Sequence, residues 1–108
     1  MTLAWTYLIV AGLLEIVWAI GLKYTQGFTQ LWPSVLTISS MVASVFLLAK
    51  AVETLPLGTA YAIWVGIGAC GTALFGIIGL QEAASPLRLL FLLLLIISII
   101  GLKVSSSS

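Results

Sequence analysis

The chain has 108 residues, of which 62% are hydrophobic and only 6% are charged. A soluble domain carries about 25% charged residues, so the composition excludes a water-exposed globular surface and indicates an integral membrane protein. The formal net charge of +1, without a basic run, excludes the electrostatic footprint of nucleic-acid binding. Because histidine and aspartate are absent, a metal site and a Ser-His-Asp triad lack their parts. We therefore predict no metal, no cofactor and no enzymatic activity.

The first two apolar runs cover residues 3–22 and 33–49. At 1.5 Å per residue, the first is about 30 Å long, which matches the hydrocarbon core of a bilayer. It contains one charged residue, Glu15. Pro33 suits the first turn of the second helix, where its missing N–H is no loss. Both runs are therefore predicted to be membrane-spanning helices.

The third and fourth runs cover residues 57–80 and 86–103. The third contains six of the ten glycines, which let helix backbones approach closely in a membrane. Its Gly66 and Gly68 predict a bend, and Ser85 can cap the fourth helix. The serines at 105–108 predict a polar, disordered tail. The fold class is therefore all-α, with residues 1–108 forming a single domain of four transmembrane helices.

Four basic residues lie at the predicted helix ends, where their side chains can reach the lipid headgroups. If the helices alternate across the membrane, Lys50 and Lys103 lie on one side and Lys23 and Arg88 on the other. The positive-inside rule then gives no preferred orientation. Either so few charges make the rule noisy, or copies insert both ways up. Two inverted copies would supply the inverted halves that many transporters need, so we predict an antiparallel homodimer in lipid.

Glu15 lies about 18 Å along its 30 Å helix, near the membrane midplane. A charge there costs roughly 3 kcal/mol on insertion scales, and no basic residue lies inside a predicted span. Such a carboxylate holds either a proton or a cation, because burial disfavours an ionised, empty state. This is the chemistry of an exchanger. The alternative is a protonated glutamate that forms hydrogen bonds between helices and serves only packing.

Two residues of the first helix share the face of Glu15. Trp18 is three residues further on, and its indole N–H can donate to the carboxylate. Gly12, about one turn before Glu15, would leave room for a ligand. These neighbours predict a cation pocket around Glu15.

Two further sets of side chains follow helical spacing. Thr37, Ser40 and Ser44 share one face of the second helix, although hydroxyls in membrane helices often bond their own backbone. Tyr61 and Trp64 share a face of the third helix. Aromatic rings beside a buried carboxylate make a cation site, but an aromatic stripe also serves packing.

Two segments form specific motifs, namely EIVWAIGLKY at residues 15–24 and LPLGTAYAIW at residues 55–64. They closely resemble the small multidrug resistance family, and the resemblance extends along essentially the whole chain. Trp18 beside the glutamate is similar to the guanidinium-exporter branch rather than the branch that exports quaternary ammonium drugs. The resemblance implies proton-coupled export across the bacterial inner membrane by an antiparallel dimer of four-helix subunits.

The resemblance also implies roles for individual residues. Glu15 would be the shared proton and substrate site. Trp18 and Ser44 would orient the carboxylate, and Tyr61 and Trp64 would line the pocket. Guanidinium suits such a site, because its planar N–H groups can bond a carboxylate in bidentate fashion.

Two regions outside the pocket match family features. Gly66 and Gly68 match the bend of the third helix, and the fourth helix, with Ser98 and Gly101, matches the dimerising helix. The sequence departs from the family there, because Phe91 and Ser98 stand where glycines seven apart are frequent.

The predicted function is a proton-coupled antiporter for guanidinium and related small guanidinyl cations. The alternatives are a quaternary ammonium or multidrug exporter of the same family, and a structural membrane subunit that carries no flux.

Overall fold

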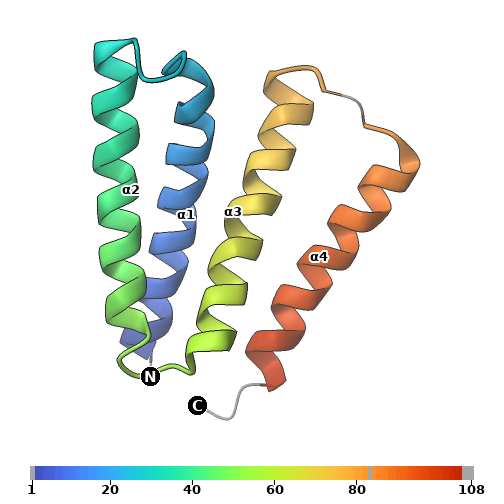
Figure 1. The fold of residues 1–108 in the computed structure, drawn as a ribbon. Helices are drawn as coiled ribbons and strands as arrows, with labels where there is room; N and C mark the ends of the chain where they lie inside the picture. The colour runs from blue at the N-terminus through green and yellow to red at the C-terminus, as the bar shows by residue number, and fades with distance from the viewer. Residues whose placement is uncertain (1, 83, 106–108) are drawn as a thin grey trace.

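Four helices make up the computed structural model, which describes residues 2–82 and 84–105. The chain crosses back and forth four times, and no strand occurs among the described residues (Figure 1). Each helix is long and apolar enough to span a membrane. These features confirm the predicted all-α, four-helix membrane fold. The helices are α1 (Thr2–Tyr24), α2 (Leu31–Ala51), α3 (Leu57–Gly79) and α4 (Pro86–Ser105).

The helix boundaries differ from the predicted ones by at most two residues. The α2 helix begins at Leu31 rather than at Pro33, with Gln30 as its N-cap residue. Pro33 is tolerated inside the first turn because the first N–H groups of a helix have no intrahelical partner. The α4 helix continues to Ser105. The predicted disordered tail of residues 105–108 was therefore wrong for Ser105, which is helical. The rest of that tail, 106–108, lies outside the described residues.

Proline and serine position the starts of the last two helices. Pro56 is the N-cap residue of α3, and its carbonyl accepts a hydrogen bond from the N–H of Ala60 at 3.0 Å. Pro86 is the first residue of α4. The Ser85 hydroxyl accepts a hydrogen bond from the N–H of Arg88 at 3.1 Å, which is the predicted cap.

The α1 helix is the centre of the subunit, because it packs against both α2 and α3, while α4 packs mainly on α3 (Figure 1). The apolar core joins the start of α1, the end of α2 and the start of α3, all near the end of the bundle where α1 begins and α4 ends (Figure 1). Its buried members are Ala4, Leu8, Ala11, Ala51, Leu55, Ala60, Ile63 and Trp64.

No described residue of α4 is buried. The helix contacts α3 where Ile99 lies against Gly66. Near its end, the Lys103 ammonium lies 4.8 Å from the centre of the Trp5 ring on α1, a cation–π contact. The remaining apolar faces of α4 are open to lipid or to another helix.

Candidate functional site

Glu15 lies on α1 directly against the backbone of α3. A Cβ atom placed on Gly68 would overlap the Glu15 carboxyl group, so only glycine leaves the room that the side chain occupies. Oxygen Oε1 of Glu15 is fully covered and has no hydrogen-bond partner among the described residues. A covered oxygen without a partner is costly. A bound proton or an N–H donor of a ligand would satisfy it.

The predicted hydrogen bond from Trp18 to Glu15 is not formed. The two residues share a face of α1, as their spacing requires, but the indole Nε1 is buried without a hydrogen-bond partner among the described residues. The ring instead packs against the apolar core. The Trp18 indole, a donor, and the Glu15 carboxyl group, an acceptor, therefore lie about one turn apart, each with an unsatisfied atom.

Ser44 connects three helices through its hydroxyl group. It donates to the carbonyl oxygen of Ala11 on α1 at 2.6 Å and accepts from Nε1 of Trp64 on α3 at 3.0 Å. A hydroxyl has a single proton to donate, so Ser44 cannot donate to Glu15 in this arrangement. That Ser44 orients the carboxylate stays a prediction, and no direct hydrogen bond to Glu15 supports it here. Ser44 orients Trp64, and its bond to Ala11 lies one helical turn from Glu15.

The predicted aromatic stripe is present on α3. The ring centres of Tyr61 and Trp64 lie 5.6 Å apart at an interplanar angle of 49°. Trp64 is buried, whereas Tyr61 is 53% exposed. The structure thus brings Ser44, Trp64 and Tyr61 together in one chain of contacts that leads from the helix interfaces to the subunit surface.

Gly12 does not leave the predicted space for a ligand. A Cβ on Gly12 would lie 2.8 Å from Cγ2 of Ile67, so the side chain of Ile67 already fills this position. The physical reason is that a missing side chain is as easily filled by a neighbouring helix as by a ligand. Gly12 therefore serves the packing of α1 against α3.

Gly66 and Gly68 lie within an uninterrupted helix from Leu57 to Gly79. Each glycine admits a side chain from another helix: Ile99 of α4 at Gly66, and Glu15 of α1 at Gly68. The helix bend stays a prediction, and close approach accounts for both residues.

The two residues predicted for the dimer helix are exposed. The Ser98 hydroxyl donates to the carbonyl of Leu94 in its own helix at 2.8 Å. A Cβ on Gly101 would meet no atom within 4 Å. Neither residue is needed for packing within the subunit.

Two threonine hydroxyls, those of Thr37 and Thr72, are buried without a hydrogen-bond partner among the described residues. The predicted site included neither of them. Thr37 lies where Gly21 admits it between α1 and α2. Thr72 lies one turn beyond Gly68 on α3. The spacing of four between Gly68 and Thr72 was the available signal.

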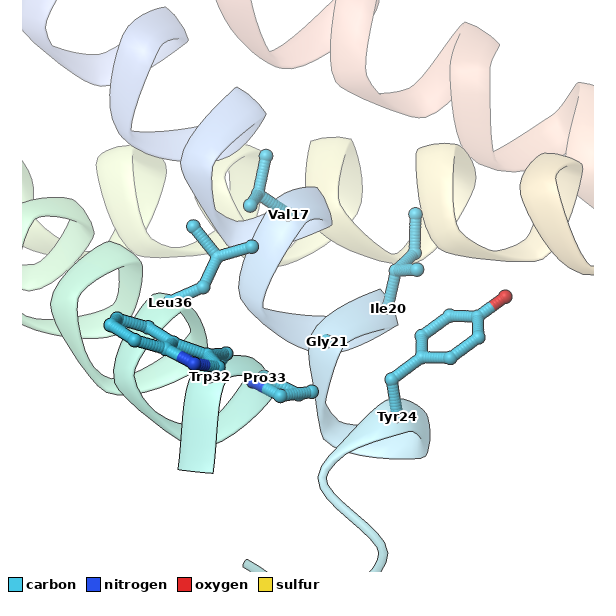
Figure 2. A pocket seen from close by; sticks show the side chains of 7 residues that line it. All are labelled: Val17, Ile20, Gly21, Tyr24, Trp32, Pro33 and Leu36. Carbon is cyan, nitrogen blue, oxygen red and sulfur yellow. The ribbon is translucent and has the colours of Figure 1, made fainter. Parts of the chain in front are cut away.

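An apolar groove of about 610 Å³ lies between α1 and α2. Figure 2 shows that Trp32, Leu36 and Tyr24 border it from the two helices. No charged residue lines it, so it is not the cation site. The lining residues are Val17, Ile20, Gly21, Tyr24, Trp32, Pro33 and Leu36.

The fold and the site together define a small multi-pass membrane protein with an acidic residue held midway along its central helix. The sequence model described as Small Multidrug Resistance protein matches residues 3–95. The chain belongs to this family, and membership of a transporter family agrees with the prediction that it is not an enzyme.

Several bacterial relatives match the chain over nearly its full length. Proteins named guanidinium exporter from Citrobacter freundii and Salmonella typhimurium are 59% identical over 104 residues, which cover 96% of this chain and 99% of theirs. A protein of the same name from Escherichia coli (strain K12) is 56% identical over the same coverage.

Proposed function

We propose that the protein exports guanidinium ion, and related small guanidinyl cations, in exchange for protons across the bacterial inner membrane. The observation that carries the proposal is the Glu15 carboxyl group, which is held against Gly68 with a covered oxygen that has no partner among the described residues. The names and the bacterial sources of the relatives support the substrate and the location.

The exchange follows from what a covered carboxyl group tolerates. An ionised, empty carboxylate is costly inside a membrane, whereas a protonated or cation-bound one is not. Guanidinium can donate two parallel N–H bonds to one carboxylate. Protonation removes the charge that attracts the cation, so proton and guanidinium exclude each other at Glu15. Each crossing in one direction then carries the cation, and the return carries the proton.

The neighbouring aromatic groups suit a planar cation. The face of guanidinium can stack on an indole or phenol ring, and Trp64 and Tyr61 supply such rings beside each other. Ser44 fixes the Trp64 ring through its hydrogen bond. The Nε1 group of Trp18, which has no partner in this arrangement, remains a donor for the Glu15 carboxylate once that group is ionised.

We also propose that two subunits assemble as an antiparallel homodimer. Two observations support this assembly: equal numbers of basic residues lie at the two ends of the bundle, and α4 presents apolar faces that the subunit leaves open. Two Glu15 groups near the dimer axis would compete for protons and substrate, so their titrations would be coupled. Labelling of single cysteines that placed every C-terminus on the same side of the membrane would rule out this arrangement.

The test uses purified protein in liposomes that contain a pH-sensitive dye. Guanidinium added outside should drive protons out of the wild-type liposomes, and Glu15→Gln should abolish this response without preventing insertion. Glu53→Gln is the matched control, because Glu53 lies in the exposed connection between α2 and α3 and should leave exchange unchanged.

Each alternative function predicts a different result in the same assay. A response to tetraethylammonium alone would assign the protein to quaternary ammonium export. No response to either cation from correctly folded protein would favour a structural subunit, and retained exchange in Glu15→Gln would refute the role of Glu15.

A further inference from the structure

A second cavity, of about 380 Å³, lies between α1, α3 and the connection from α3 to α4. In contrast to the groove of Figure 2, its lining includes charged side chains. The polar ones are Lys23, Thr72, Glu82 and Arg88. The other seven lining residues are apolar, and the charged side chains lie at helix ends. The cavity, called the vestibule below, thus combines apolar walls with a charged mouth.

The inner end of this vestibule lies close to the proposed cation site. Its lining includes Ala19, one turn beyond Glu15 on α1, and Thr72, one turn beyond Gly68 on α3. One turn of a helix is about 5.4 Å, and Gly68 itself contacts the Glu15 carboxyl group. The covered Thr72 hydroxyl, which lacks a partner among the described residues, lies on this path. The vestibule thus reaches from the end of the bundle to about one turn from Glu15.

The Glu82 carboxylate lies at the outer end of the vestibule. The chain turns back at Gln81, which adopts a left-handed conformation with φ of 58°. The N–H of Glu82 then donates to the carbonyl of Gly76 at 2.9 Å. A Cβ on Gly76 would overlap the Glu82 carboxylate, so this glycine makes room for it. The turn therefore places the Glu82 carboxylate over the last turn of α3.

Arg88 neutralises this carboxylate in the structure. Its Nη2 atom lies 3.1 Å from Oε1 of Glu82, and the side chains of Arg88 and Glu82 are 36% and 47% exposed. Exposed ion pairs of this kind are weak. The guanidinium head of Arg88 is also the same chemical group as the proposed substrate. A free guanidinium ion can therefore replace it on Glu82 at little cost.

We propose that Glu82 forms an outer binding site for a planar guanidinium cation, which Arg88 occupies until the substrate displaces it on the way to Glu15. This site rests on the proposed function of guanidinium transport. Glu82 offers the cation a weak, exposed partner at the mouth of the vestibule, whereas the covered Glu15 binds the cation for transport.

The charged side chains of the lining could also bind an anion, since Lys23 and Arg88 could hold the phosphate of an anionic lipid. The geometry favours a cation. The backbone of Glu82 is held by the bond from its N–H to Gly76, and the carboxylate lies at the C-terminal end of α3, where the helix dipole attracts cations and repels anions.

The experiment measures initial rates of guanidinium-driven proton movement in liposomes over a range of guanidinium concentrations. Glu82→Gln should raise KM about two- to fivefold, the size expected for a weak exposed ion pair, with kcat unchanged. Glu82→Asp, which keeps the carboxylate, should restore most of the affinity. Arg88→Gln should lower KM, because it removes the internal competitor. Glu53→Gln, on the opposite connection, should have no effect.

The outcomes separate this site from the proposed function. If wild-type protein shows no guanidinium response, the proposed function fails. If wild type responds and Glu82→Gln matches Glu53→Gln, only the outer site fails. A purely structural ion pair predicts the same change from Glu82→Gln and Arg88→Gln. An anion site predicts that Arg88→Gln slows transport in liposomes containing anionic lipid, and either result would overturn the proposal.

Discussion

The helices α1 and α4 pack against α3 in different ways. Toward α1, Gly68 and Gly71 have no side chain, and Glu15 and Ile16 occupy the resulting space. Toward α4, Gly66 admits Ile99, and no described residue of α4 becomes buried. Without a hydrophobic driving force in lipid, helices associate where small residues allow close packing. The closest packing of α3 therefore lies where the candidate site is, whereas α4 keeps its surface for other contacts.

The hydroxyl groups follow the same division. Ser44 bonds across helices, to Ala11 of α1 and Trp64 of α3. Ser98 of α4 bonds the carbonyl of Leu94 in its own helix. A bond between helices fixes their relative position, whereas a bond within one helix does not. The Ser44 hydroxyl thus joins α1, α2 and α3, whereas the Ser98 hydroxyl leaves the position of α4 to contacts such as Ile99 with Gly66 and Lys103 with Trp5.

The largest effect on the subunit is expected at Gly71. A Cβ at this position would overlap the side chain of Ile16, so Gly71→Val should destabilise the protein by about 1–3 kcal/mol, the usual cost of overpacking. Gly58→Val is the matched control on the same helix, because nothing lies within 4 Å of a Cβ there. It should change stability by less than about 0.5 kcal/mol. Unfolding in mixed detergent micelles measures both, and equal stabilities would contradict the close α1–α3 contact.

Composition and spacing predicted the parts of the fold that depend on local sequence. Long apolar runs predicted four membrane helices, because a bilayer demands about 20 apolar residues per helix. The spacing of Thr37, Ser40 and Ser44 predicted a shared face, and all three are buried on α2. The hydrophobic period and the length of a helix depend on its own sequence, so they can be predicted without knowing how the helices pack.

The partners of side chains across helices could not be predicted in this way. Trp18 has the correct spacing to reach Glu15 but packs into the core. Gly12 has no side chain, yet Ile67 fills its space. Each outcome depends on the distance and rotation of a second helix, which the spacing within one helix does not fix. The roles of the site residues and the antiparallel dimer remain predictions.

Ser44 is expected to give the next largest effect. Ser44→Ala leaves the buried Nε1 of Trp64 without its acceptor, so stability should fall by about 1 kcal/mol and guanidinium affinity should weaken as the ring loses its orientation. Ser98→Ala is the control and should change stability by less than about 0.5 kcal/mol. Combined with Trp64→Phe, the loss from Ser44→Ala should shrink, because both changes remove the same bond. Fully additive losses would show that the Ser44–Trp64 bond contributes nothing.

The smallest effect on the subunit is expected at Gly101. Open space surrounds a Cβ at this position, so Gly101→Leu should leave subunit stability unchanged or slightly higher, since leucine favours a helix by up to about 1 kcal/mol over glycine. If α4 forms the dimer contact through small residues, the added side chain should separate the two helices and reduce the dimer fraction. Cross-linking in detergent and in liposomes measures that fraction, with Gly58→Leu as a control on α3. An unchanged dimer fraction would remove Gly101 from the interface, whereas unfolding of the subunit would contradict the open space around Gly101.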